Sequence, residues 1–204
     1  MGLFLSILVE SKARYEKEKH SWVNYCNMNQ LVYFDIGYET GVPIGRVLIE
    51  LKPSYSVSLT ELFLKIARGE FVHPAYGKKI EYTGTILHIV STSKNLIMGG
   101  DVLYGNGSGG CAPVCANVFQ EKNLTTTVTN SRGKLVMMSS GSNPTLFSSI
   151  FYVLLDNSGP SIVDGCVIGD VIEGIEVLDK IVREEGSENG RSLRKLVVQK
   201  CGHL

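Results

Sequence analysis

The sequence has no excess of charge of either sign. Its 20 lysines and arginines balance 20 aspartates and glutamates, so the formal net charge at pH 7 is +0. Proteins that bind nucleic acids or anionic membrane surfaces usually carry a clear basic excess. The balance argues against both kinds of partner, and we expect no nucleic-acid ligand.

A long hydrophobic run is also missing from the start of the chain. The apolar stretch from Leu3 to Val9 covers seven residues, whereas a membrane-spanning helix needs about 20. No basic residue precedes this stretch and no small-residue cleavage site follows closely, so it does not fit a secretory signal peptide. We expect no membrane span.

The five cysteines include no Cys-x-x-Cys pair, and the four histidines are equally scattered. This spacing fits no zinc site. An odd number of unpaired cysteines is typical of free thiols in a reducing compartment. We therefore expect no metal or other cofactor, and a location in the cytoplasm, with the nucleus as the alternative.

Residues 1–29 differ in pattern from the rest of the chain. Oppositely charged side chains stand four residues apart, as on the solvated face of a helix. This segment is predicted to be an amphipathic helical extension, which docks either on its own domain or on a partner protein. Its apolar residues, at about heptad spacing, are Phe4, Leu8, Tyr15 and Trp22.

Residues 30–204 have the length and the apolar content of one globular domain. From residue 31 the apolar residues alternate as they do in strands. Residues 31–38 and 44–51 predict a hairpin, with Gly41 and Pro43 in its turn. Further strands are predicted at 85–90, 134–140, 150–155, 166–171 and 194–201.

Two helices are predicted inside this domain. The first begins at a capping box formed by Ser58 and Glu61 and ends at Gly69. The second runs from Glu173 to Val182. Many short strands with two helices indicate a mainly β fold, an antiparallel barrel or sandwich whose open ends the helices cover.

The glycine-rich segment 105–110 satisfies the pattern G-x-G-x-x-G. A dinucleotide site requires a helix directly after such a loop, because the helix amides face the pyrophosphate. Here Cys111-Ala-Pro113 follows and no helical pattern begins. The segment is therefore not predicted to bind a nucleotide.

Several short motifs follow one another along the chain in a characteristic order. They are Gly99-Gly100-Asp101, Asn106 to Gly110, Phe119 with Glu121 and Asn123, Asp164-Gly165, Gly186 to Gly190, and Cys201 to Leu204. With these motifs the chain resembles the cyclophilins over residues 31–204, which implies a closed antiparallel eight-stranded β-barrel capped by two helices, with a peptide groove on its outer face. The resemblance also implies peptidyl-prolyl cis-trans isomerase activity, which serves protein folding.

The residue on which cyclophilin catalysis depends is absent. The family supplies an arginine in a Phe-His-Arg segment, and the matching segment here is Leu87-His88-Ile89. No catalytic residue is therefore intact: Ile89 stands at the arginine position, and His88 is either a remnant of the site or a structural histidine. The nearest cations in the sequence are Lys94, interpreted as a solvated loop residue, and Arg132.

Other positions of the implied groove are altered as well. Met98 replaces a glutamine, Leu96 falls where methionine is usual, and Ser139 replaces an asparagine. The resemblance implies that a proline-containing peptide or protein segment is the ligand. The residues implied to line its groove are His88, Leu96, Ile97, Met98, Met138, Ser139, Tyr152 and Val163.

These substitutions lead to three functional hypotheses. The first is a cyclophilin-like isomerase whose activity is weak or absent, because a hydrogen-bond donor for the twisted prolyl bond is missing. The second is a non-catalytic proline-peptide binding or scaffold module, to which residues 1–29 recruit a partner protein. The third is a structural component of a larger assembly, in which residues 1–29 fill the groove of their own domain.

Overall fold

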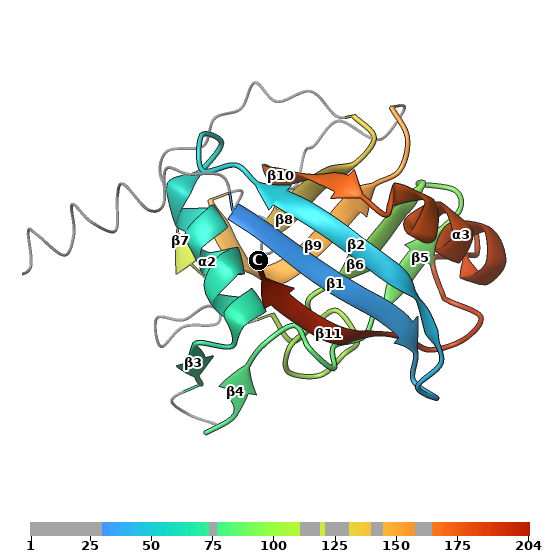
Figure 1. Cartoon of the computed structure of the whole chain (residues 1–204), viewed down its shortest axis with the longest axis horizontal. Helices are drawn as coiled ribbons and strands as arrows, with labels where there is room; N and C mark the ends of the chain where they lie inside the picture. The colour runs from blue at the N-terminus through green and yellow to red at the C-terminus, as the bar shows by residue number, and fades with distance from the viewer. Residues whose placement is uncertain (1–29, 74–76, 111–118, 121–130, 140–144, 158–164) are drawn as a thin grey trace, which may run out of the picture.

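The computed structural model describes residues 30–73, 77–110, 119–120, 131–139, 145–157 and 165–204 (Figure 1). The predicted helical extension over residues 1–29 lies outside the described residues. Two helices and eleven strands are present in the described part of the chain. Their bounds are β1 (Gln30–Tyr38), β2 (Pro43–Leu51), α2 (Val57–Arg68), β3 (Phe71–Val72), β4 (Lys79–Ile80), β5 (Ile89–Ser91), β6 (Leu96–Gly99), β7 (Phe119–Gln120), β8 (Lys134–Ser139), β9 (Leu146–Leu154), β10 (Gly165–Glu173), α3 (Ile175–Glu185) and β11 (Leu196–His203).

Nine of these strands form one antiparallel sheet. Eight follow the order β11-β1-β2-β10-β8-β9-β6-β5, and β7 pairs with β9. The short strands β3 and β4 form a separate hairpin. The prediction of a mainly β, antiparallel fold with two helices is confirmed, and Figure 1 shows α2 and α3 at opposite ends of the sheet.

The opening hairpin forms where the alternation predicts it. β1 pairs with β2 so that Val32 lies opposite Ile49 and Phe34 opposite Val47, and all four side chains are buried. Gly41, in the connecting turn, has a φ of 93°, which glycine adopts without steric cost. Alternate residues of both strands therefore face the interior.

Helix α2 begins two residues earlier than the predicted capping box. Ser56, rather than Ser58, is the N-cap: its side chain accepts a hydrogen bond from the Leu59 amide at 3.2 Å. The predicted end is confirmed, because Gly69 adopts the left-handed conformation at the C-cap, with a φ of 62°. The apolar face of α2 contacts β9, β10 and β11.

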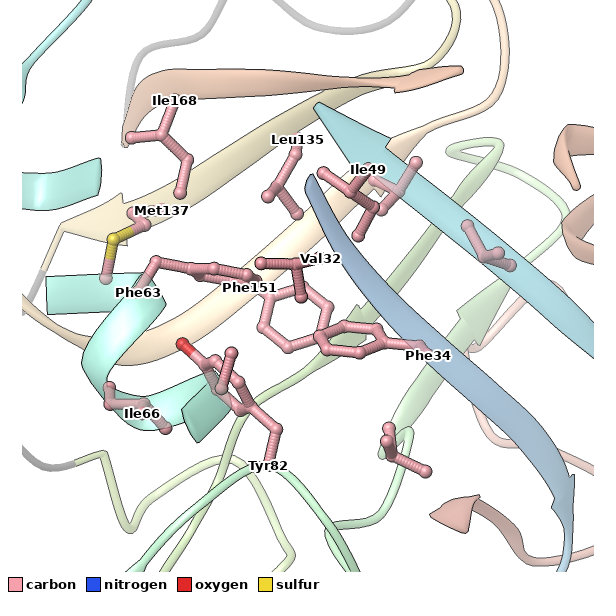
Figure 2. Packing of buried hydrophobic residues seen from close by; sticks show 14 of the residues in the cluster. Val32, Phe34, Ile49, Phe63, Ile66, Tyr82, Leu135, Met137, Phe151 and Ile168 are labelled. Atoms are coloured by element: carbon pink, nitrogen blue, oxygen red, sulfur yellow. The ribbon is translucent and has the colours of Figure 1, made fainter. Parts of the chain in front are cut away.

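The core lies between the inner face of the sheet and α2. Four aromatic rings meet there, with neighbouring ring centroids 4.7 to 6.0 Å apart. Each of these rings comes from a different part of the chain, so the cluster ties β1, α2 and β9 together. Figure 2 shows these rings, which belong to Phe34, Phe63, Tyr82 and Phe151.

The prediction of a closed barrel is wrong, because the sheet is open between β5 and β11. The two ends are connected through the chain before β5: Ile86 forms an isolated bridge with Val197, the Leu87 amide donates to the Leu196 carbonyl at 3.0 Å, and the Val198 amide donates to the Thr85 carbonyl at 2.9 Å. The outer edge of β5 is occupied by the chain that follows α3. The Val90 amide donates to the Gly190 carbonyl at 2.9 Å, and the Ser187 amide donates to the Val90 carbonyl at 3.1 Å. β5 thus pairs with β6 on one edge and with residues 187–190 on the other. A closed barrel would require β11 on that second edge.

Candidate peptide-binding groove

Three partly exposed side chains form a row across the outer face of the sheet. Ile89 of β5 lies opposite Met98 of β6, and Met98 lies opposite Tyr152 of β9. The next position in the row is Val136 of β8, which is fully buried beside Tyr152. Residues directly opposite on adjacent strands have contacting side chains. The row is therefore a continuous apolar strip.

Strand alternation divides the predicted groove residues between the two faces of β6. Leu96 and Met98 are two residues apart and share the outer face with the row. Ile97 lies between them and points into the core, where it is 2% exposed. The structure therefore corrects the interpretation of Ile97: it is a core residue and does not line the groove.

A small second cluster supports the tyrosine of the row. Val136, Leu154 and Val167 form this outer cluster, and Tyr152 packs against it. Val136 was not among the predicted groove residues. The sequence could have indicated Val136, because it stands two residues before Met138 on the same strand, and residues two apart on a strand share a face.

Met138 and Ser139 lie at the end of β8. Met138 is partly exposed and pairs with Gly165 of β10. Ser139 is 5% exposed and pairs with Phe147 of β9. Since Ser139 is buried, any contact with a bound peptide falls to its exposed neighbour. Val163, the remaining predicted groove residue, lies outside the described residues.

The structure separates His88 from the row. Both of its ring nitrogens are buried and have no hydrogen-bond partner among the described residues. Its ring lies so close to Gly107 that a Cβ on that glycine would be 3.0 Å from the ring. Burial lowers the pKa of His88, and the nearby Asp101 charge and Ile86 backbone act in the opposite direction. The imidazole is therefore neutral and covered, and it offers no donor to the groove.

Asp101 organises the glycine-rich loop that covers His88. Burial by itself raises the pKa of the Asp101 carboxyl, but hydrogen bonds from backbone amides of the loop outweigh burial and lower this pKa to about 2. A carboxylate that accepts several amides is stabilised in its charged form. The five amides that donate to it, at 2.7 to 3.1 Å, belong to Leu103, Tyr104, Asn106, Gly107 and Gly109.

The two candidate replacement cations occupy different environments. Arg132 donates to the Leu155 carbonyl and to the Asp179 carboxylate of α3, so its guanidinium already has partners. Lys94 is exposed in the turn between β5 and β6. Neither residue belongs to the row that contains Ile89, so the strip itself is uncharged.

Two further observations bear on ligands. Among the described residues, no cluster of three or more histidine, cysteine or acidic side chains is placed to hold a metal ion. Within the same residues, neither helix has the length and apolar character needed to cross a membrane.

Comparison with known proteins agrees with this geometry. A relative from Bos taurus, "Probable inactive peptidyl-prolyl cis-trans isomerase-like 6", is 27% identical over 204 residues. The match covers 100% of this chain and 61% of that relative, so the chain spans about three fifths of the relative's length. The family model described as "Cyclophilin type peptidyl-prolyl cis-trans isomerase/CLD" matches residues 33–203. With the curved antiparallel sheet and its apolar outer strip, this match shows that the chain belongs to the cyclophilin-type peptidyl-prolyl cis-trans isomerase family.

Proposed function

We propose that this domain binds proline-containing segments on its outer strip and isomerises them weakly or not at all. Prolyl isomerisation breaks no covalent bond, and its barrier of roughly 20 kcal/mol comes from lost amide resonance. An efficient catalyst must place a donor at the proline nitrogen of the twisted state. At Ile89 and Met98 the strip presents apolar side chains, neither of which can act as such a donor.

The observation that carries this proposal is the position of Ile89 opposite Met98. Ile89 stands where the family has its arginine and Met98 where it has a glutamine. An isoleucine and a methionine present no hydrogen-bond donor. Loss of a donor that acts in the transition state typically reduces the rate by about 10² to 10³.

Binding is supported by features that do not depend on the arginine. Tyr152 is held against the outer cluster and remains partly exposed, which suits packing against a proline ring. Met138, which is partly exposed, extends the apolar surface at the end of β8, whereas Leu96 shares this face but is only 6% exposed. An extended peptide can also pair with main-chain groups at the edge of such a site.

Fluorescence anisotropy with a labelled peptide tests this function. A peptide containing Ala-Pro should bind more tightly than the same peptide with Ala-Ala, because only the proline ring fills the strip. Met98→Ala should weaken binding of the proline peptide. Val57→Ala, on the exposed start of α2, is the matched control and should leave binding unchanged. Equal affinity for both peptides would contradict the proposal.

We also propose a role for residues 1–29 and a cellular compartment for the protein. Residues 1–29 are proposed to recruit a partner protein, because their sequence combines apolar residues at about heptad spacing with opposite charges four residues apart, a pattern typical of amphipathic helices. The cytoplasm, or the nucleus, is proposed as the compartment, since the sequence has an odd number of scattered cysteines without a Cys-x-x-Cys pair. Deleting residues 1–29 should abolish partner binding while leaving the affinity for a proline peptide within about twofold, a difference of about 0.4 kcal/mol.

A further inference from the structure

The chain that connects α3 to β11 is fixed at its base. Glu185 is 1% exposed, and it accepts hydrogen bonds from Tyr38 at 2.8 Å and from both Arg194 Nε at 3.1 Å and a terminal nitrogen of that guanidinium. The Arg194 guanidinium also lies 4.1 Å from the centre of the Tyr38 ring. The ion pair between Glu185 and Arg194 therefore joins the two ends of the segment 186–193. We call this pair, with Tyr38, the anchor.

The same connection runs along the edge of β5, on the side of the sheet where Figure 1 shows α3. Beyond the backbone hydrogen bonds to Val90, Ser93 donates from its hydroxyl to the Glu188 carbonyl at 2.9 Å. Gly190 lies against Ile89, since a Cβ on Gly190 would be 3.0 Å from Ile89 Cγ2. The connection thus borders the apolar strip at the position of the missing arginine.

Arg191 follows Gly190, and its peptide group is held on both sides. Its amide donates to Asn189 Oδ1 at 3.0 Å, and its carbonyl accepts from Ser187 Oγ at 2.5 Å. The Arg191 side chain is exposed, and it forms no hydrogen bond or ion pair with another described residue. Glu188, in the same connection, is also exposed and does not pair with it. The backbone of Arg191 is therefore fixed one residue after the glycine that lies against Ile89, and its side chain is exposed without a partner among the described residues.

We propose that Arg191 selects ligands carrying an aspartate or glutamate close to the proline that occupies the strip. This inference rests on the proposed peptide binding and names the class of peptide preferred. A guanidinium binds a carboxylate in a bidentate manner. The strip itself contains no charge, so a charge at its border is a main source of discrimination between otherwise equal proline peptides.

Paired peptides that differ only in charge test the inference on the full chain. Labelled Ala-Pro peptides carrying glutamate or glutamine at each of three positions on either side of the proline are titrated at low salt. At one or more positions the glutamate peptide should bind about two to five times more tightly, as for exposed ion pairs. Added salt should reduce this preference.

Two matched variants assign the preference to one residue. Arg191→Gln should abolish the preference while leaving the affinity for the glutamine peptide unchanged. Lys94→Gln, on the turn beyond β5, should retain the preference. Binding of both peptides with equal affinity would overturn the inference alone, as would a preference that survives in Arg191→Gln. Failure of every peptide to bind, with the chain folded by circular dichroism, would overturn the proposed function together with the inference.

Discussion

Ile89 and Met98 lie directly opposite each other on two antiparallel strands, and both are partly exposed on the outer face of the sheet. The pair joins β5 to β6. We propose that these two positions correspond to the arginine and the glutamine of the family, so that two apolar side chains stand in place of two polar ones. The proposed loss of activity follows from this pair, and the proposed retention of binding follows from Tyr152 beside it.

Restoring the arginine should raise the isomerase rate. In Ile89→Arg the new guanidinium stands beside Met98, and the rate constant should increase by about tenfold or more, out of the 10² to 10³ that such donors supply. A protease-coupled peptide assay measures it. Ile89→Met is the control, because its side chain is long but has no donor. A folded Ile89→Arg variant no faster than Ile89→Met would show that more than one group is missing.

Removing the Tyr152 ring should weaken peptide binding. Tyr152→Ala is expected to reduce the affinity for a proline peptide by about tenfold, a loss of roughly 1.4 kcal/mol. The same variant should lower the free energy of unfolding, because Tyr152 packs on the outer cluster. Tyr152→Phe keeps the ring and should retain most of the affinity. Unchanged binding in a folded Tyr152→Ala variant would move the peptide site away from the strip.

The Asp101 carboxylate should stabilise the fold in a pH-dependent manner. The pKa of this carboxyl is lowered from 3.8 to about 2. A lowered pKa in the folded state gives stability that is present above pH 3.8 and is lost as the pH falls towards 2. Asp101→Asn should therefore cost about 2 kcal/mol at neutral pH.

Urea unfolding at several pH values checks this prediction. The difference in free energy of unfolding between the natural chain and Asp101→Asn should be largest at neutral pH and should shrink in acid. Asp156→Asn is a useful comparison, because Asp156 accepts a hydrogen bond from the Asn95 side chain at 2.6 Å, whereas Asp101 accepts hydrogen bonds from five backbone amides. A difference that stays constant with pH would contradict the role of the Asp101 charge.

The anchor at Glu185 should matter more than nearby surface pairs. Arg194→Ala leaves the buried Glu185 carboxylate with the Tyr38 hydroxyl, and we expect a loss of about 2 to 3 kcal/mol in the free energy of unfolding. Arg183→Ala removes an exposed pair with Glu184 at 3.6 Å, and it should cost less than about 0.5 kcal/mol. Chemical denaturation measures both, and similar losses in the two variants would count against the anchor.

The sequence predicts the helices and strands of this fold better than it predicts which strands pair with each other. Alternation identifies the hairpin of β1 and β2, and Gly69 marks the end of α2, because these signals are local. Whether β5 pairs with β11 depends on hydrogen bonds between segments far apart in the chain. Instead, the Gly190 carbonyl accepts a hydrogen bond from Val90 of β5. No local sequence pattern predicts which of two distant segments will pair with this strand.

For the groove, the sequence likewise identifies the segment but does not show which of its side chains face outward. A family resemblance places Leu96, Ile97 and Met98 together as one segment, but three consecutive residues of a strand cannot share a face. The register puts Ile97 in the core and Met98 on the strip. His88 likewise has the right residue type for a donor, yet a glycine-rich loop covers its ring.

The isomerase rate of the unmodified chain tests the central claim most directly. A protease-coupled assay at high protein concentration, on a sample shown to be folded, compares the observed rate with that of buffer alone. We predict a rate equal to, or only slightly above, the uncatalysed rate. Turnover comparable to that of a family member with the arginine would contradict the account.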